Sequence, residues 1–238
     1  MAAPLFRFKQ FHLEQEGVTQ PAGTDGVLLG AWTEIRQARD ILDIGAGTGL
    51  IALMLAQRSG PEVRITAVEI HPESAACARR NFSNSPWTER LTVMAQAVQD
   101  VAHKAKQRFD LIVSNPPFFS ETIISPDEKR RLARHTQTLR TADLLGAVQA
   151  LLAPGGRFCL ILPTAEGRRF VEQACLSGLY CTKETQVYPR RGKAVERLLL
   201  QFERNPYPFE RSKIEIYEQG EQWSAQFRAL TAAFYLNF

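Results

Sequence analysis

The sequence contains few cysteines and no long uninterrupted apolar run. Its cysteines are Cys77, Cys159, Cys175 and Cys181, and no two of them form a Cys-x-x-Cys pair. This spacing argues against a disulfide framework or a zinc site, and we expect buried, reduced thiols. No apolar stretch reaches the length of a membrane-spanning helix. Near the N-terminus, charged residues interrupt the apolar ones, whereas a signal peptide has an uninterrupted apolar core. We therefore expect a cytoplasmic protein that binds no metal and no membrane.

The sequence does have the composition of a globular protein. Hydrophobic residues make up 45% and charged residues 23% of its 238 residues, values typical of a folded domain. This length suits one large domain with a sizeable core, and we find no internal repeat. We expect a single domain over residues 1–238, with a cap and a helix in residues 1–36 and the core in residues 37–238.

The basic residues are clustered rather than evenly spread. The formal net charge of +4 permits a nucleic-acid partner without requiring one. For any one cluster, a solvated surface is an equally good interpretation, but several clusters on one chain favour contact with phosphates. The candidate RNA-binding residues are Lys129, Arg130, Arg131, Arg134, Arg190, Arg191 and Lys193.

Strand-like and helix-like segments alternate along most of the chain. We predict strands at residues 40–44, 63–70, 91–95, 109–114 and 157–162, and helices at 26–36, 50–58, 72–82, 98–107, 142–152 and 166–176, with a turn at 153–156. This alternation predicts a doubly wound α/β fold, because parallel strands need crossover helices. Strands at 185–188 and 196–202 are joined by too few residues for a crossover, so they must form an antiparallel hairpin. The result is a mostly parallel, seven-stranded sheet with helices on both faces.

The motif Asn115-Pro116-Pro117-Phe118 follows the predicted strand at 109–114. Two prolines cannot donate to a sheet ladder, so the strand must end there with free carbonyl groups. The Asn side chain adds another acceptor and the Phe adds a flat face, which together suit a planar amine. A simple strand-ending turn is the alternative interpretation of this motif taken alone.

A glycine-rich loop, Asp43-Ile44-Gly45-Ala46-Gly47-Thr48-Gly49, joins the first core strand to a helix. Its third glycine comes one residue earlier than in the Gly-x-Gly-x-x-Gly loop of dinucleotide sites. The Asp43 carboxylate would repel a pyrophosphate but suits the α-ammonium of a methionine moiety. These features favour S-adenosylmethionine over NAD. Glu69, at the end of the second core strand, could accept hydrogen bonds from ribose hydroxyls.

Together, the glycine loop, Glu69, the Asn-Pro-Pro-Phe motif and the hairpin resemble the class I S-adenosylmethionine-dependent methyltransferases, which have a Rossmann-like fold. Within that class the sequence resembles the bacterial tRNA (adenine-N6) methyltransferases that act at position 37 of valine tRNA. The stretches that carry this second resemblance are Phe8-Lys9-Gln10-Phe11, Gly23-Thr24-Asp25-Gly26-Val27-Leu28-Leu29-Gly30-Ala31-Trp32, Asn84-Ser85-Pro86-Trp87 with Glu89-Arg90, and Leu230-Thr231-Ala232-Ala233-Phe234-Tyr235-Leu236.

The resemblance implies a set of site residues. The catalytic residues would be Asn115, Pro116, Pro117 and Phe118, and the cofactor would contact Gln10, Thr24, Asp43, Gly45, Gly47, Gly49, Glu69, Ile70, Gln96, Ala97 and Asn115. Many relatives have an Asp that binds the cofactor adenine where this sequence has Ala97. Gln96 or the backbone amide of Ala97 would replace that contact. The N-terminal cap and helix would cover the cofactor site.

We therefore expect transfer of a methyl group from S-adenosylmethionine to the exocyclic N6 amine of a tRNA adenine. The sequence leaves open methylation of guanine N2 in ribosomal RNA or of a protein glutamine, because Asn-Pro-Pro-Phe suits each planar amine or amide. It also leaves open a non-catalytic RNA-binding protein on the same fold, and the oligomeric state. An NAD-dependent dehydrogenase is disfavoured by the glycine spacing.

Overall fold

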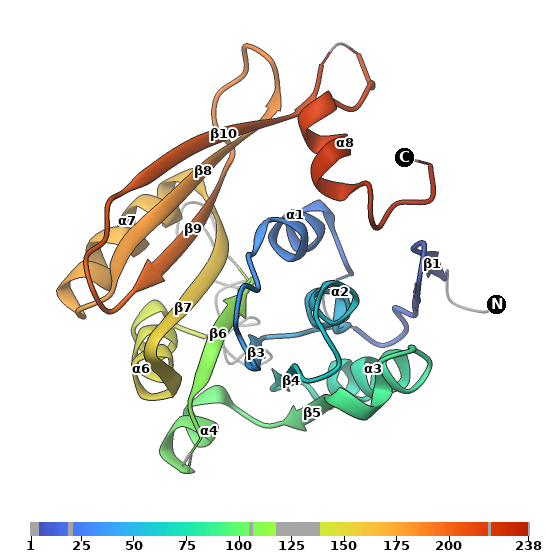
Figure 1. Cartoon of the computed structure of the whole chain (residues 1–238), viewed down its shortest axis with the longest axis vertical. Coiled ribbons are helices and arrows are strands. Elements are labelled where there is room, and N and C mark those ends of the chain that lie inside the picture. Colours follow the sequence, from blue (N-terminus) through green and yellow to red (C-terminus); the bar gives the residue numbers. More distant parts are fainter. Residues whose placement is uncertain (1–4, 19–20, 105–106, 118–138, 219, 238) are drawn as a thin grey trace, which may run out of the picture.

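The computed structural model describes residues 5–18, 21–104, 107–117, 139–218 and 220–237. Its central sheet consists of β3 (Asp40–Ile44), β4 (Arg64–Glu69), β5 (Leu91–Ala95), β6 (Phe109–Ser114), β7 (Leu152–Pro163), β8 (Tyr180–Arg190), β9 (Arg197–Glu203) and β10 (Glu210–Tyr217). The eight strands lie in the order β5-β4-β3-β6-β7-β9-β8-β10 (Figure 1). Strand β9 is antiparallel to both β7 and β8, and every other neighbouring pair is parallel.

Helices cover both faces of this sheet. They are α1 (Thr24–Trp32), α2 (Leu50–Arg58), α3 (Pro72–Ser83), α4 (Val98–Lys104), α6 (Thr141–Leu151), α7 (Thr164–Leu176) and α8 (Ala225–Thr231). Alternate residues of a strand point to opposite faces, so Ile41 and Leu111 join one core with α1, α2 and α8, whereas Leu42 and Ile112 join the other with α4, α6 and α7. Figure 1 shows the two helical layers on either side of the sheet. No helix in the described ranges is long and apolar enough to cross a membrane.

The predicted doubly wound architecture and its C-terminal hairpin are confirmed. The predicted count of seven strands is wrong, because β10 adds an eighth strand beside β8. The predicted turn at residues 153–156 is a bulge inside β7: the partner of Phe109 is Leu152, whereas that of Leu111 is Arg157. Among the cysteines, Cys77 and Cys159 are buried as expected, but Cys175 is exposed.

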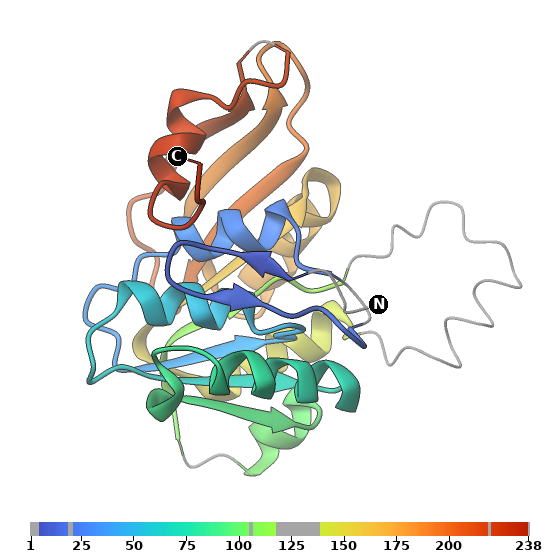
Figure 2. The same ribbon diagram turned by 90° about the vertical axis from the view of Figure 1, so that its right-hand side faces the viewer.

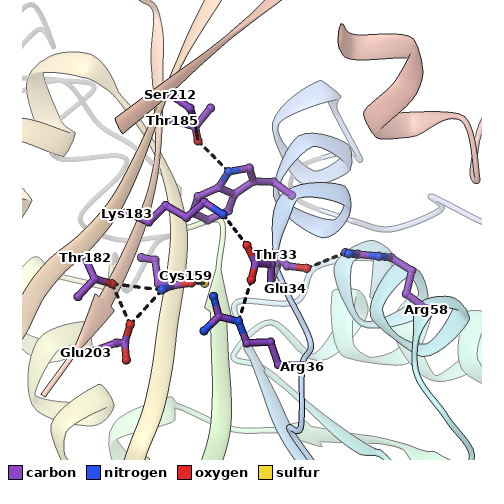
Figure 3. A network of polar contacts seen from close by, with 12 residues as sticks. Thr33, Glu34, Arg36, Arg58, Cys159, Thr182, Lys183, Thr185, Glu203 and Ser212 are labelled. Atoms are coloured by element: carbon purple, nitrogen blue, oxygen red, sulfur yellow. Dashed lines mark hydrogen bonds and ion pairs between the residues drawn. The ribbon is translucent and has the colours of Figure 1, made fainter. Parts of the chain in front are cut away.

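The first helix ends earlier than predicted, at Trp32 rather than at residue 36. Arginine side chains satisfy the carbonyl groups that a further turn would have bonded. Arg58 donates to the carbonyls of Gly30 at 2.6 Å and Thr33 at 2.8 Å, and Arg157 donates to the Ile35 carbonyl at 3.1 Å. Figure 3 shows Arg58 of α2 reaching this end of α1. Three carbonyl groups at this end of α1 therefore have side-chain donors in place of helical N–H groups.

The N-terminal and C-terminal segments of the chain pack together. Strand β1 (Phe6–Arg7) pairs antiparallel with β2 (His12–Leu13), and Figure 2 shows these strands lying alongside α1 and α2. Between them, Lys9 donates its backbone N–H to the Phe234 carbonyl at 2.8 Å and its ammonium to the Ala232 carbonyl at 2.7 Å. The ring of Phe8 lies 6.0 Å from that of Tyr235. The N-terminal segment is thus held in place by contacts with the C-terminal segment.

Candidate active site

Asn115 directly follows β6 at the carboxyl edge of the sheet, the edge where open α/β sheets bind their ligands. In the sheet register Ser114 pairs with Ile44, and the buried Ser114 hydroxyl donates to the Ile44 carbonyl at 2.9 Å. This bond joins the ends of β6 and β3. Asn115 therefore lies beside the loop that begins at Gly45.

The remainder of the Asn-Pro-Pro-Phe motif is described only in part. Asn115 is half-buried, Pro116 is buried and Pro117 is exposed. Phe118 lies outside the described residues, as do the candidate RNA-binding residues Lys129, Arg130, Arg131 and Arg134. The Asn115 side chain lies near Gly26 of α1, because a β-carbon built on Gly26 would lie 4.0 Å from the Asn115 amide nitrogen.

The glycine loop adopts backbone conformations that other residues rarely adopt. Gly45, Gly47 and Gly49 have φ angles of 71°, 55° and 81°, which favour glycine at each position. A β-carbon on Gly45 or Gly47 would meet no atom within 4 Å, so the space over these residues is open. At Gly49, by contrast, it would lie 2.5 Å from the Phe82 ring, so this glycine also permits close packing of α3.

Glu69 braces the same loop. One carboxylate oxygen accepts the Gly47 N–H at 2.9 Å and the other accepts the His71 N–H at 2.9 Å. The side chain is nearly buried, with 6% of its surface exposed. Each carboxylate oxygen has a second lone pair, so Glu69 could still accept hydrogen bonds from a pair of hydroxyl groups.

Asp43 is fully buried beneath the loop, and only one of its oxygens is satisfied. Oδ2 accepts the Ala52 N–H at 3.2 Å, whereas Oδ1 has no partner among the described residues. Burial raises the pKa of Asp43 to about 7; the Ala52 bond opposes this shift and the nearby Glu69 charge adds to it. A buried carboxylate with an unpaired oxygen raises the free energy of the folded protein unless a cation or a hydrogen-bond donor reaches it. Asp43 is thus suited to binding a positively charged group.

Of the other predicted cofactor residues, some lie at the carboxyl edge of the sheet near the glycine loop and one lies on the β1–β2 turn. In the sheet register Glu69 pairs with Ala95, so Ile70 and the half-buried Gln96 and Ala97 follow neighbouring strand ends at the carboxyl edge. Thr24 begins α1, two positions before Gly26. Gln10 is exposed on the β1–β2 turn, and in the described part of the chain no hydrogen bond joins it to the glycine loop.

The sequence did not identify Asn81, a buried residue that joins the N-terminal segment to the loop. Its amide nitrogen donates to the carbonyls of Thr48 at 2.9 Å and Glu14 at 3.0 Å, and its oxygen accepts the Glu14 N–H at 2.8 Å. The only sequence signal is an Asn within a helix, where this residue has low propensity. The segment before α1 is therefore attached directly to the glycine loop.

The hairpin residues Arg190, Arg191 and Lys193 lie at the same edge of the sheet as Asn115. The register of β9 pairs Arg197 with Pro163, at the carboxyl end of β7. Arg190 is engaged within the protein: it lies 5.2 Å from the centre of the Tyr217 ring and donates to the Gly220 carbonyl. Arg191 and Lys193 are exposed. Of the three, these two are the more available for a partner.

No group of three or more His, Cys, Asp or Glu side chains in the described ranges could hold a metal ion. A surface pocket of about 530 Å³ lies away from Asn115. Trp87, Arg64 and Arg90 are among its lining residues, and Arg64 begins β4 at the amino edge of the sheet. This pocket belongs to the opposite edge of the sheet from the glycine loop.

Comparisons with known proteins agree with this geometry. The family model for the methyltransferase small domain matches residues 23–174. The chain is 43% identical to the tRNA1(Val) (adenine(37)-N6)-methyltransferase of Histophilus somni over 233 residues, which cover 98% of each protein. It is 41% identical to the protein of the same name from Tolumonas auensis, covering 100% of this chain and 99% of that protein. The crystal structure of a predicted O-methyltransferase from Agrobacterium tumefaciens has a TM-score of 0.68 at 22% identity, covering 88% of this chain and 96% of that one, a likeness of fold.

Proposed function

The chain belongs to the tRNA1(Val) (adenine(37)-N6)-methyltransferase family, and we propose that it transfers the methyl group of S-adenosylmethionine to the N6 amine of adenine 37 in a valine tRNA. The observation that carries this proposal is the position of Asn115 beside the glycine loop, where an amine acceptor and a cofactor site meet. Identity over nearly the whole chain supports the choice of tRNA.

The residues around the loop fit the cofactor that the family uses. The unpaired Oδ1 of Asp43 suits an α-ammonium group, and the carboxylate of Glu69 suits a pair of ribose hydroxyls. The open space over Gly45 and Gly47 would accept a ligand in contact with the backbone. We assign the adenine contact of the cofactor to Gln96 or to the amide of Ala97. S-adenosylmethionine supplies an electrophilic methyl group on a sulfonium.

Asn115 and Pro116 would prepare the amine for attack. The purine ring withdraws the N6 lone pair, so this amine is a poor nucleophile. Hydrogen bonds from N6 to the Asn115 side-chain oxygen and to the Pro116 carbonyl would localise the lone pair on nitrogen. The lone pair forms the N–C bond as the S–C bond breaks, and the resulting ammonium then loses a proton to solvent. Positioning supplies much of the rate enhancement, and no strong base is required.

The remaining predicted residues would hold the RNA. We propose that Phe118 stacks on the adenine after it is unstacked from the anticodon loop. The RNA phosphates would be contacted by Arg191 and Lys193, together with Lys129, Arg130, Arg131 and Arg134. Arg190 would support the hairpin turn.

A tRNA substrate also implies a cytoplasmic location.

Transfer of a labelled methyl group tests this proposal. We expect total RNA incubated with the protein and labelled S-adenosylmethionine to yield labelled N6-methyladenosine after nucleoside digestion, and a valine tRNA transcript with guanine at position 37 to accept none. Label in N2-methylguanosine, or in a protein glutamine when ribosomes are supplied, would contradict the proposal.

Asn115→Ala should abolish transfer, because the amine loses its side-chain acceptor. Cofactor affinity measured by calorimetry should stay within a few-fold, since Asp43 and Glu69 are untouched. Normal turnover by this variant would exclude the role of Asn115.

A further inference from the structure

An ion pair holds the first turn of α1 to the start of β9. The Asp25 carboxylate lies 2.8 Å from Nε of Arg197, although the two residues are far apart in sequence. Their side chains are 29% and 35% exposed, so the pair is partly shielded from water. Arg197 also donates from Nη1 to the Glu196 carbonyl at 3.2 Å, which fixes the orientation of the guanidinium.

This pair lies one residue from Gly26, the residue of α1 that lies near the Asn115 amide. Gly26 follows Asp25 in the helix, and a β-carbon there would be 3.2 Å from Leu50 and 4.0 Å from the Asn115 amide nitrogen. In the part of the chain that the structure describes, the Asn115 amide has no hydrogen-bond partner. Gly26 thus leaves little more than the room of one β-carbon between the first turn of α1 and this amide, and a shift of that turn would change the space available to it.

The other end of α1 has its own attachments, which are independent of Asp25. The indole N–H of Trp32 donates to the Thr185 hydroxyl at 2.8 Å, and the Lys183 ammonium lies 2.5 Å from the Glu34 carboxylate. Arg58 binds the carbonyls at the same end (Figure 3). Loss of the Asp25–Arg197 pair should thus release the first turn without detaching the helix.

A direct phosphate contact is the competing role for Arg197, which lies close to the basic hairpin turn. Its charge is already neutralised by Asp25, and its Nε–H is occupied. A guanidinium held by a carboxylate in this way attracts phosphate less strongly than the exposed Arg191 and Lys193, which have no carboxylate partner among the described residues. The geometry favours a role within the protein.

We propose that Arg197 is a positioning residue that, by holding Asp25, fixes the first turn of α1 and so sets the Asn115 amide against the substrate amine. This inference rests on the proposed function, because it takes Asn115 as the group that accepts the amine hydrogens. Arg197 itself does not touch the reacting atoms.

Steady-state kinetics with tRNA tests the role. Arg197→Met and Asp25→Asn should each lower kcat by roughly tenfold to a hundredfold, because misplacing a reacting group by about 1 Å has effects of this size. KM for tRNA and affinity for S-adenosylmethionine should change little. The double variant should lose no more than either single variant, as expected for two residues that act through one contact. Arg197→Lys should recover part of kcat.

Lys183→Met is the matched control, since it removes an ion pair at the other end of α1. It should keep kcat, with any loss confined to the melting temperature. Unchanged kcat in Arg197→Met would overturn the proposal, as would additive effects in the double variant or an equal loss in the control. A raised KM with unchanged kcat in Arg197→Met alone would assign Arg197 to phosphate binding instead.

Transfer by the unaltered protein is measured first. Its absence on tRNA would contradict the proposed function, whereas normal transfer with unaffected variants would contradict only the role of Arg197.

Discussion

At the scale of single residues, the burial of Asp43 links proton binding to folding. Its pKa in the folded protein, about 7, lies above its ordinary value of 3.8, so the folded state binds more protons than the unfolded state between these values. The contribution of Asp43 to stability is therefore greatest below about pH 3.8. It falls as the pH rises to about 7 and then stays constant.

The same titration predicts a pH dependence of cofactor binding. An ammonium group binds the Asp43 carboxylate and not the neutral acid, so affinity for S-adenosylmethionine should fall by roughly tenfold per pH unit below about pH 7. Calorimetry from about pH 6 to about pH 8 measures this dependence. Asp43→Asn should bind weakly with a flat profile. An affinity of the unaltered protein that stays constant over this range would show that Asp43 does not receive the cation.

At the scale of elements, Asn81 joins three parts of the chain: α3, the segment before α1 and the glycine loop. Asn81→Ala should lower the free energy of unfolding by about 2 to 3 kcal/mol, because it removes the partners of the half-buried Glu14 N–H and the buried Thr48 carbonyl. It should also weaken cofactor binding, since the loop loses a support. Chemical denaturation and calorimetry measure the two effects.

Asn84→Ala is the matched control for Asn81. Asn84 follows the same helix but is exposed, and in the described part of the chain its side chain makes one long hydrogen bond, of 3.5 Å, to the Glu14 carboxylate. Its free energy of unfolding should change by less than about 0.5 kcal/mol. Equal losses in the two variants would mean that the buried bonds of Asn81 contribute little.

Elements with a strong local pattern could be predicted from the sequence, and those that depend on distant partners could not. The apolar strands at Asp40–Ile44 and Phe109–Ser114 have the predicted bounds because burial on both faces leaves a continuous hydrophobic run. The first half of β10, Glu210 to Lys213, is exposed and charged, and it becomes a strand only because β8 offers it a free edge. No local signal marks this half of the strand.

The residues of the candidate site also fall into a group that the sequence predicts and a group that it does not. The glycine loop, Asp43, Glu69 and Asn115 have a recognisable spacing, and the structure places them at one edge of the sheet. Asn81 and the Asp25–Arg197 pair act through contacts between residues distant in sequence. A single sequence does not show which arginine meets which carboxylate. The roles of Phe118 and of residues 129–134, which fall outside the described residues, stay predictions.

At the scale of the whole molecule, the exposed Arg191 and Lys193 predict a salt-dependent RNA contact. Replacing both with glutamine should weaken tRNA binding and reduce the slope of log affinity against log salt by roughly one per lost phosphate contact. Filter binding over a range of salt concentrations measures the slope. Arg108 is exposed and directly precedes β6 at the amino edge of the sheet, so Arg108→Gln should leave the slope unchanged. An unaltered slope in the double variant would place the RNA elsewhere.

Because the N-terminal segment packs against the C-terminal one, it can complete its contacts only at the end of synthesis. The partners of Lys9 are the carbonyls of Ala232 and Phe234, which leave the ribosome long after the residues of the glycine loop. Until then the Phe8 ring lacks its neighbour Tyr235, and Lys9 lacks both of its carbonyl partners. We therefore expect the nascent chain to be unable to retain the cofactor, so that an interrupted translation product cannot act on the tRNAs that surround it.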